Sequence, residues 1–295
     1  MSTETTPRDL LTPSLLEPIP LLDHGFLRLV DAMPRLVTGD ETADHAIVRA
    51  ARVSTAGGSA GTKGATADRG LIRYLMRHGH TSPFEMVELK FHAKLPIFVA
   101  RQWIRHRTAS VNEVSARYSV LPEEVYVPAP EHIGTQGTTN RQGSGGAHQH
   151  ADVIAAAMGI DMRRSHIVYS TGIEQGVARE TARVVLPVAT YTEWYWKANL
   201  LNVFRFLHLR MDSHAQYEIR VYAEAMARLV RAVAPWSFEA FEDYWQGSPR
   251  LSAREWAVVR AVLTPEQSER IVATLEADAE VSAGEVREWR DKVGR

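Results

Sequence analysis

A basic segment rich in hydroxyl and amide groups spans residues 101–118, RQWIRHRTASVNEVSARY. Its four arginines and His106 are accompanied by a single carboxylate, Glu113. Guanidinium groups bind phosphate oxygens in pairs, and serine hydroxyls or backbone N–H groups complete such sites. The whole chain has a formal net charge of -1, so this local positive excess predicts a site for a phosphorylated small molecule.

The alternative is an ordinary solvated basic surface, and the spacing of the basic residues argues against it. Arg105, His106 and Arg107 are consecutive, so an α-helix would spread their side chains around most of its circumference. They can meet one ligand only where a helix ends and the backbone turns. We therefore expect the helix opened by Pro96 to end at this triplet.

Composition restricts the chemistry further. The chain has 295 residues and no cysteine, which excludes disulfides, zinc–thiolate sites, iron–sulfur clusters and a cysteine nucleophile. Its 45% hydrophobic and 23% charged residues are typical of a globular protein with one large domain or two ordinary ones. Lys and Arg number 34 against 35 Asp and Glu, which argues against a nucleic-acid partner.

The N-terminal residues do not resemble a targeting segment. MSTETTPRDLLTPSLLEPIP carries acids and prolines where a signal peptide has a basic start and an unbroken apolar run. No stretch reaches about 18 uninterrupted apolar residues, the minimum for a membrane-spanning helix. We expect a cytoplasmic protein with no membrane partner.

Hydrophobic periodicity predicts the elements that position the basic segment. Residues 87–94 and 188–198 alternate apolar with polar side chains, as half-buried strands do. The expected helices cover residues 43–53, 71–77, the segment after Pro96, 200–209 and 214–233. A short strand at the edge of a sheet is expected over 26–33, and Gly79 is expected to cap the helix 71–77 in the left-handed conformation.

The remaining segments predict the domain organisation. Residues 1–22 read as a flexible lead-in and 23–245 as the catalytic domain, with inserted loops near 55–67 and 134–150. The first loop lacks the Gly-Lys-Ser/Thr order of a phosphate loop. Residues 246–295 are expected to form a helical extension, because three pairs have capping-box spacing: Ser252/Glu255, Thr264/Gln267 and Ser282/Glu285.

Arg105-His106-Arg107, seven further residues and Ser115 resemble the RHR-x7-S signature of flavin-dependent thymidylate synthases. Five blocks agree with that family in order and spacing: HGHTSPFE (78–85), PIFVARQWIRHR (96–107), NEVSARYS (112–119), ARVVLP (182–187) and LRMDSHAQYEI (209–219). The resemblance spans roughly residues 25–243.

The resemblance implies an α/β (α+β) subunit with an antiparallel-type sheet flanked by helices. It also implies a homotetramer with FAD and dUMP at sites shared between chains. The family converts dUMP to dTMP, with 5,10-methylenetetrahydrofolate as one-carbon donor and NADPH as reductant through FAD. The missing cysteine agrees, because conventional thymidylate synthesis needs a thiolate, whereas here the cofactor supplies the reducing equivalents.

The resemblance also assigns residues to roles. The expected dUMP contacts are Gln102, Trp103, Ile104, Arg105, Glu113, Val114, Ser115, Ala116, Arg117, Arg183 and Arg210. The expected FAD contacts are Ser54, Ser82, Arg105, His106, Arg107, Glu113, Asn199 and Arg205, and His80 and Tyr118 are expected in the same pocket. Leu201 stands where the family often has a flavin-contacting arginine, and Arg205, one turn later, is a candidate replacement for its charge.

Arg210 is expected to activate the uracil, because a guanidinium stays charged and offers paired donors to the uracil edge. Two structural alternatives for Arg210 remain open: an ion pair with Asp212, or capping of the helix that ends near Leu209.

Two other functions stay as alternatives. An arginine-rich nucleic-acid-binding protein without catalysis would explain the clustered arginines, but it predicts an overall basic domain. A metal hydrolase could use some of the 12 histidines, but no HExxH pair exists, and His148 and His150 lack a carboxylate partner. We therefore expect no metal site.

Overall fold

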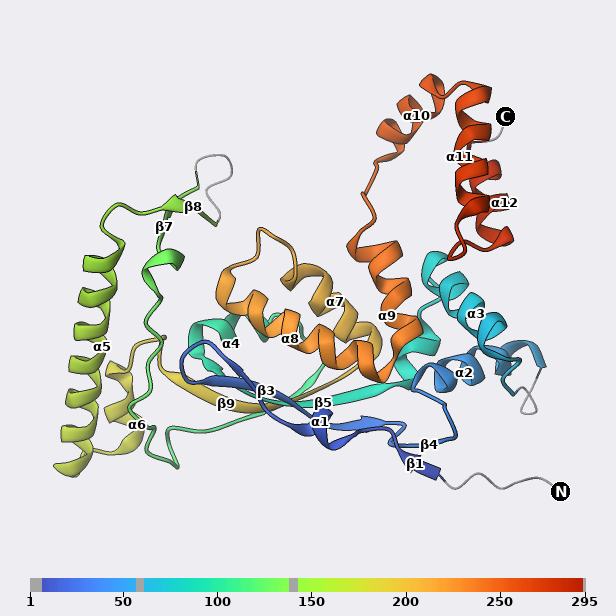
Figure 1. Cartoon of the computed structure of the whole chain (residues 1–295). Coiled ribbons are helices and arrows are strands. Elements are labelled where there is room, and N and C mark those ends of the chain that lie inside the picture. The colour runs from blue at the N-terminus through green and yellow to red at the C-terminus, as the bar shows by residue number, and fades with distance from the viewer. Residues whose placement is uncertain (1–6, 57–60, 138–142, 294–295) are drawn as a thin grey trace. The chain divides into compact units, whose positions relative to one another are not determined.

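A computed structural model of the chain describes residues 7–56, 61–137 and 143–293 (Figure 1). The chain divides into two compact units, residues 1–241 and 242–295. The first unit contains the whole basic segment, so it is described in more detail. In the part of the chain that the structure describes, no helix is long and apolar enough to cross a membrane.

The first unit is built on a five-stranded sheet in which every neighbouring pair is antiparallel. The strand order is β2 (Ile19–Leu21), β3 (Gly25–Met33), β5 (Glu88–Pro96), β9 (Tyr191–Asn199) and β6 (Ser110–Glu113). The expected antiparallel sheet flanked by helices is therefore confirmed. β3 is paired on both sides, so the prediction that it forms a sheet edge is wrong.

An aromatic cluster joins the sheet to the helices. The β9 residues Trp194 and Trp196 alternate with the exposed Glu193 and Tyr195, as period-2 patterning requires. Both indoles pack against Trp103 at ring-centroid distances of 5.5 and 5.6 Å. The indole N–H groups of these three tryptophans find no hydrogen-bond partner among the described residues.

Helices cover one face of this sheet. α4 (Ile97–Trp103), α7 (Leu200–Arg210) and α8 (Tyr217–Val233) lie over it in Figure 1. α2 (Asp44–Ala56), α3 (Ala65–Arg77), the short helix η2 (Ser82–Met86) and α9 (Pro235–Phe241) pack at one end. Gly79 has φ 67°, and Gly79 and His80 donate backbone bonds to Met76 and Leu75, so the expected left-handed cap of α3 is confirmed.

Two segments expected to be irregular contain regular structure. Residues 7–21 form β1 (Pro7–Asp9), α1 (Pro13–Leu16) and β2, and β1 pairs with β4 (Leu36–Thr38). α3 begins at Ala65, inside the Gly-rich stretch. The backbone N–H of Lys63 donates to Asp68, whose carboxylate also receives a 2.5 Å bond from Arg52. The backbone N–H of Lys63 is therefore already used, and residues 57–60 of this stretch lie outside the described residues.

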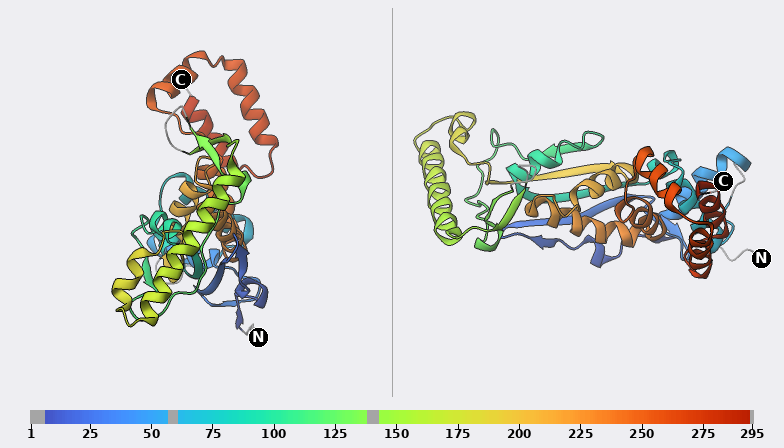
Figure 2. Two further views of the ribbon diagram at one scale, coloured as in Figure 1. Left: turned by 90° about the vertical axis from the view of Figure 1, so that its left-hand side faces the viewer. Right: turned by 90° about the horizontal axis from the view of Figure 1, so that it is seen from above.

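An arm extends the unit beyond the sheet. It contains η3 (Pro130–His132), the hairpin of β7 (Gly134–Gln136) and β8 (Ser144–Ala147), α5 (Ala151–Glu174), α6 (Arg179–Ala182) and η4 (Arg183–Val185). Figure 2 shows α5 at the opposite end of the sheet from α2 and α3. No element was expected over residues 151–174. An inserted loop was expected near 134–150; of these residues the structure describes 134–137 and 143–150, which contain the paired strands β7 and β8.

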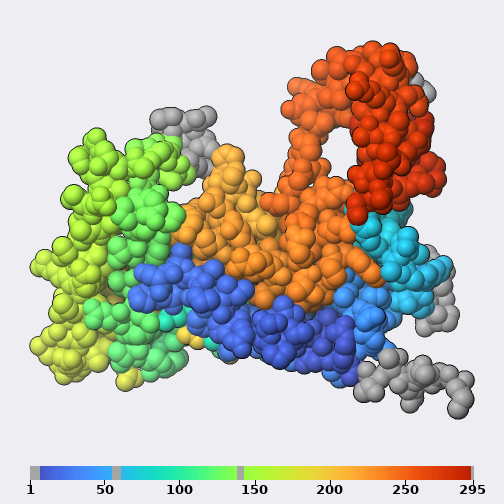
Figure 3. Space-filling model, in the orientation of Figure 1, coloured from blue at the N-terminus to red at the C-terminus, as the bar shows by residue number. Residues whose placement is uncertain are grey.

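α5 is covered by the rest of the unit along one narrow stripe only. Its buried residues are Ala151, Gly159, His166 and Tyr169. The Tyr169 hydroxyl accepts the backbone N–H of Leu121 at 3.0 Å and fixes the helix to the loop after β6. On another face Val153, Ile160 and Ile167 are 69%, 60% and 59% exposed, seven residues apart, and in Figure 3 the helix forms part of the outer surface. An apolar face is therefore open to solvent.

The second unit is helical, as expected. It contains a π-helical turn at Glu242–Gln246, α10 (Ala253–Val262), α11 (Pro265–Ala277) and α12 (Ala283–Val293). Complete capping boxes begin α10 at Ser252 and α11 at Thr264. Ser282 and Glu285 make the corresponding pair of bonds before α12, so all three predicted caps are confirmed. The domain boundary at residue 245 stays a prediction.

Candidate functional site

The triplet Arg105-His106-Arg107 directly follows the end of a helix, as predicted from the sequence. α4 ends at Trp103, and residues 105–107 form the turn that leads to β6. Arg105 and Arg107 are exposed, and neither side chain bonds to any other described residue. Two guanidinium groups at one turn are therefore available for a ligand.

His106 takes a different direction from its two neighbours. Its ring packs edge-on against Phe206 of α7, with centroids 5.1 Å apart, and its Nε2 accepts a 3.1 Å hydrogen bond from Nε of Arg210. Burial, together with the positive charge of Arg210, lowers the pKa of His106 from 6.5 to about 4. His106 is therefore neutral at physiological pH.

Arg210, the last residue of α7, makes a second bond to the same segment. Its Nη2 donates to the carbonyl oxygen of Gln102 at 3.2 Å. Burial lowers the pKa of Arg210, but a guanidinium stays charged at any working pH. The two structural alternatives are not observed: Asp212 accepts from His214 instead, and no described carbonyl at the end of α7 accepts from Arg210.

A cavity of about 890 Å³ opens beside this contact. Gln102, Arg210 and Gln216 line one side, and the amide of Gln102 donates to that of Gln216. The stacked rings of His132 and Tyr217 and backbone of the β7–β8 hairpin line another. The cavity is large enough for a mononucleotide, and its charged lining residues are Arg210, Arg220, Glu131 and Glu218.

The end of β6 forms a second group of predicted site residues. The Glu113 carboxylate accepts a 2.6 Å bond from the buried Thr192, and the Ser115 hydroxyl accepts the backbone N–H of Arg117 at 3.3 Å. Val114 is partly exposed, whereas Ala116 is buried. The chain therefore turns tightly at Ser115 and directs Arg117 outward.

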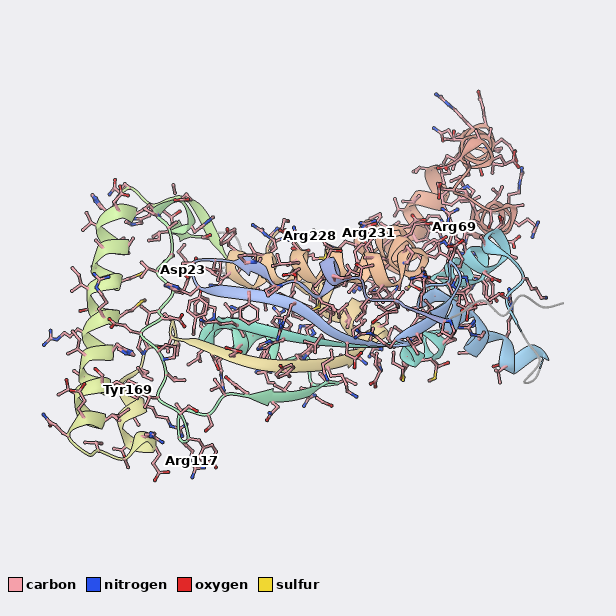
Figure 4. All side chains as sticks on the ribbon, turned by 60° about the horizontal axis from the view of Figure 1, so that its bottom comes forward. Asp23, Arg69, Arg117, Tyr169, Arg228 and Arg231 are labelled. Atoms are coloured by element: carbon pink, nitrogen blue, oxygen red, sulfur yellow. The ribbon has the colours of Figure 1, made fainter. Side chains whose placement is uncertain are left out.

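Arg117 and Tyr118 lie against α6. Arg117 pairs with Glu180 at 3.4 Å, and Arg179 donates to the backbone carbonyl of Tyr118 at 3.0 Å. Figure 4 shows Arg117 at the α5–α6 end of the first unit. Arg183 follows α6 directly, and its side chain bonds to no described residue. Ser115, Arg117 and Arg183 thus form a second basic group on neighbouring elements.

The remaining predicted residues form a third group around η2 and the start of α7. Ser54, His80 and Ser82 are exposed on α2, after α3 and at the start of η2. Asn199 caps α7 by accepting the backbone N–H of Asn202 at 3.0 Å. The Asn202 side chain in turn accepts from Arg205 at 3.2 Å.

The departure at Leu201 has a structural reason. Leu201 is 2% exposed and packs in the core, so the leucine side chain does not reach a ligand. Arg205, one turn later on α7, is exposed. Trp103, a predicted dUMP contact, is likewise fully buried, so only its backbone could reach a ligand. Ile104, the next predicted contact, is partly exposed.

The predicted dUMP residues do not all line one cavity in this chain. Gln102 and Arg210 do, but no residue of 113–118 nor Arg183 is among the cavity's lining residues. His132, Gln216, Tyr217 and Glu218 also line the cavity and were not predicted. Gln216, Tyr217 and Glu218 lie within the recognised block 209–219, which was a usable signal, whereas His132, which stacks on Tyr217 from 85 positions away, had none.

The described residues contain no group of three or more His, Asp or Glu side chains that could hold a metal ion. The metal-hydrolase alternative therefore has no site in this part of the chain.

Comparison with known proteins decides the family. A family model described as "Thymidylate synthase complementing protein" matches residues 35–236. A flavin-dependent thymidylate synthase of Ruegeria pomeroyi is 51% identical over 282 residues, which are 94% of this chain and 88% of that protein. One of Dictyostelium discoideum is 52% identical over 239 residues, which are 81% of this chain and 78% of its own.

The chain belongs to the flavin-dependent thymidylate synthase family. A solved structure agrees: the UMP/dUMP methylase PolB from Streptomyces cacaoi, bound with 5-Br dUMP, is 35% identical, with a TM-score of 0.68. The match covers 78% of this chain and 100% of that one. The nucleic-acid-binding alternative finds no support in these comparisons.

The flavin-dependent thymidylate synthase family implies an FAD cofactor, and the donor set of this chain fits one. FAD carries a diphosphate, and the unpaired guanidinium groups of Arg105 and Arg107 share one exposed turn. Arg205, His80 and Ser82 add exposed donors around η2 and α7. Their individual contacts stay predictions.

Proposed function

We propose that this chain methylates dUMP to dTMP, with 5,10-methylenetetrahydrofolate as one-carbon donor and NADPH as reductant through FAD. Arg210 carries the proposal: it is fixed beside a nucleotide-sized cavity by two protein acceptors, His106 and the carbonyl of Gln102. A guanidinium has five N–H donors, so three remain for a ligand.

Those donors suit the edge of a uracil ring. Paired N–H groups at a carbonyl oxygen and the adjacent N3 stabilise negative charge on the ring, which makes its carbon-5 more nucleophilic. Gln102 and Gln216 add amide groups on the same wall and would orient the ring. When bound, FAD would carry the reducing equivalents from NADPH, and the reaction would need no cysteine nucleophile, which this chain lacks.

Ser115, Arg117 and Arg183 are the proposed phosphate ligands. They lie on adjacent elements, and two of them carry a permanent positive charge at an exposed surface. A dianionic phosphate binds well to such a pair completed by a hydroxyl. The proposed FAD contacts are Arg105, His106, Arg107, Glu113, Ser54, Ser82, Asn199 and Arg205, with His80 and Tyr118 in the same pocket.

The residues proposed to bind the uracil line the cavity, whereas those proposed to bind the phosphate do not. We therefore propose that a second copy of the chain completes each site within a homotetramer. The exposed apolar face of α5 supports association between copies. We place the protein in the cytoplasm, where its proposed nucleotide and folate substrates are made and used.

The test is an anaerobic assay of the FAD-loaded protein with NADPH, methylenetetrahydrofolate and dUMP, followed by chromatography. We expect dTMP only when all components are present. Arg210→Ala should retain FAD and its reduction by NADPH but lose about 100-fold or more in dTMP formation. No dTMP from the wild type would contradict the proposed function.

UMP is the second candidate substrate, because the name of the Streptomyces neighbour includes UMP. The relatives at 51% and 52% identity are named as thymidylate synthases, which favours dUMP. The same assay with UMP in place of dUMP separates the two. A UMP methylation rate equal to that with dUMP would widen the proposed substrate class.

A further inference from the structure

Arg210 is a long side chain at the very end of its helix, so its position depends on what it bonds to. Its Nε and Nη2 donors, both used by protein acceptors, lie along one edge of the planar guanidinium. Nη1 and the second hydrogen of Nη2 form the free edge, and the residue lines the cavity. The two acceptors therefore decide which way the free donors point.

Both acceptors belong to the segment at the end of α4, and both are rigidly held. The carbonyl of Gln102 is part of the last helical turn. His106 donates its backbone N–H to Trp103 at 3.0 Å, and its ring lies against the fully buried Phe206. His106 is thus fixed from two sides, with its Nε2 directed at Arg210 and not into the cavity.

The hydrogen bond also fixes the protonation of the ring. Arginine can only donate, so His106 must present an unprotonated Nε2 and carry its single proton on Nδ1. Burial and the neighbouring guanidinium favour the same neutral form. A neutral ring cannot bind the FAD diphosphate as a cation, which sets His106 apart from Arg105 and Arg107.

We propose that His106 is a positioning residue for Arg210: its neutral imidazole aligns the free guanidinium edge with the uracil. The proposal rests on the proposed function. It predicts that loss of the Nε2 acceptor lowers dUMP affinity and slows methylation even in protein that is fully loaded with FAD.

Three variants test the acceptor. His106→Gln places a carbonyl oxygen near the position of Nε2, His106→Asn places one near Nδ1, and His106→Phe keeps the ring on Phe206 without an acceptor. The measurements are bound FAD, the rate of flavin reduction by NADPH, dUMP affinity by calorimetry, and single-turnover dTMP formation. All are made on the FAD-loaded protein.

We expect His106→Phe and His106→Asn to slow dTMP formation about 10- to 100-fold at saturating dUMP, because a small misplacement of a catalytic group costs that much. His106→Gln should restore the rate to within about fivefold of the wild type. The rates are compared at equal FAD content, because His106 is also a proposed FAD contact. If His106→Phe does not fold, the Gln and Asn variants still give the comparison, and equal losses in both overturn the proposal.

A double-mutant cycle gives the sharpest result. When Arg210 is already alanine, His106→Phe should change neither dUMP affinity nor the residual rate by more than about twofold. A full additive loss in that background would overturn the positioning role and favour a role for His106 that does not depend on Arg210. Failure of the proposed function is distinguishable, because the wild type would then make no dTMP, while calorimetry still reports dUMP binding.

Discussion

The burial of His106 beside Arg210 makes folding stability depend on pH in a defined direction. His106 has a folded pKa of about 4, against 6.5 for an unperturbed histidine. Between these values the unfolded chain binds a proton that the folded chain does not, so this residue lowers the free energy of unfolding as the pH falls from 6.5 towards 4. Above pH 6.5 its contribution is constant.

Denaturant unfolding between pH 7 and 4.5 measures this effect. His106→Gln removes the titrating group, so its unfolding free energy should fall less steeply with decreasing pH than that of the wild type. Parallel pH profiles for the two proteins would contradict the neutral, buried state of His106.

Ser115 gives a second prediction for a single residue. Its hydroxyl accepts the N–H of Arg117 within the turn, and the proposed phosphate site surrounds it with positive charge. Ser115→Ala should weaken dUMP binding about tenfold through loss of one charge-assisted hydrogen bond, with dTMP formation still measurable at saturating dUMP. Ser119→Ala, in the same exposed loop, is the control. Complete loss of chemistry at saturation would instead make Ser115 a nucleophile.

Among the elements, the β7–β8 hairpin contributes backbone to the wall of the cavity, and its glycines are not equivalent. A Cβ at Gly134 would lie 2.7 Å from Ser144 Cβ and 2.9 Å from the Gly145 carbonyl oxygen, whereas one at Gly146 would meet nothing within 4 Å. Gly134→Ala should therefore force the strands apart, and Gly146→Ala should be tolerated.

Calorimetry with dUMP and dTMP formation measure the outcome. We expect Gly134→Ala to lower dUMP affinity severalfold while the melting temperature falls by only a few degrees, since the hairpin lies outside the main core. Equal affinities for the two glycine variants would show that the hairpin wall does not contact the substrate.

The elements also differ in how well the sequence predicted them. β5 and β9 followed from alternation, because one of their faces packs on helices and the other does not. α5 was missed because Val153, Ile160 and Ile167 are apolar and exposed, so its apolar residues do not mark one buried stripe. The strands of the β7–β8 hairpin were missed because their glycine-rich, polar sequence has little β propensity.

Some features of the candidate site could be predicted from the sequence and others could not. The turn after α4 followed from three consecutive basic residues. The bond from Arg210 to His106 did not, since it joins residues 104 positions apart and depends on how α7 packs against α4. No local pattern encodes such a contact.

At the scale of the whole molecule, the open face of α5 is the feature that a single chain leaves unexplained. If copies associate through it, Ile160→Glu should weaken the proposed homotetramer, because the charge would have to be buried. Sedimentation velocity should show smaller species for Ile160→Glu and unchanged species for Ala273→Glu, an exposed position on α11. Identical distributions for both variants would place the interface elsewhere.

The three tryptophans of the central cluster have a consequence for spectroscopy. Trp103, Trp194 and Trp196 lie in apolar surroundings without a described hydrogen-bond partner for their indole N–H groups, and Trp103 is two residues from Arg105. Indoles in such surroundings fluoresce at short wavelengths, where flavins absorb. Energy transfer from this cluster to a bound flavin should then quench the blue side of the emission band. An optical titration could follow cofactor loading in variants that have lost all catalysis.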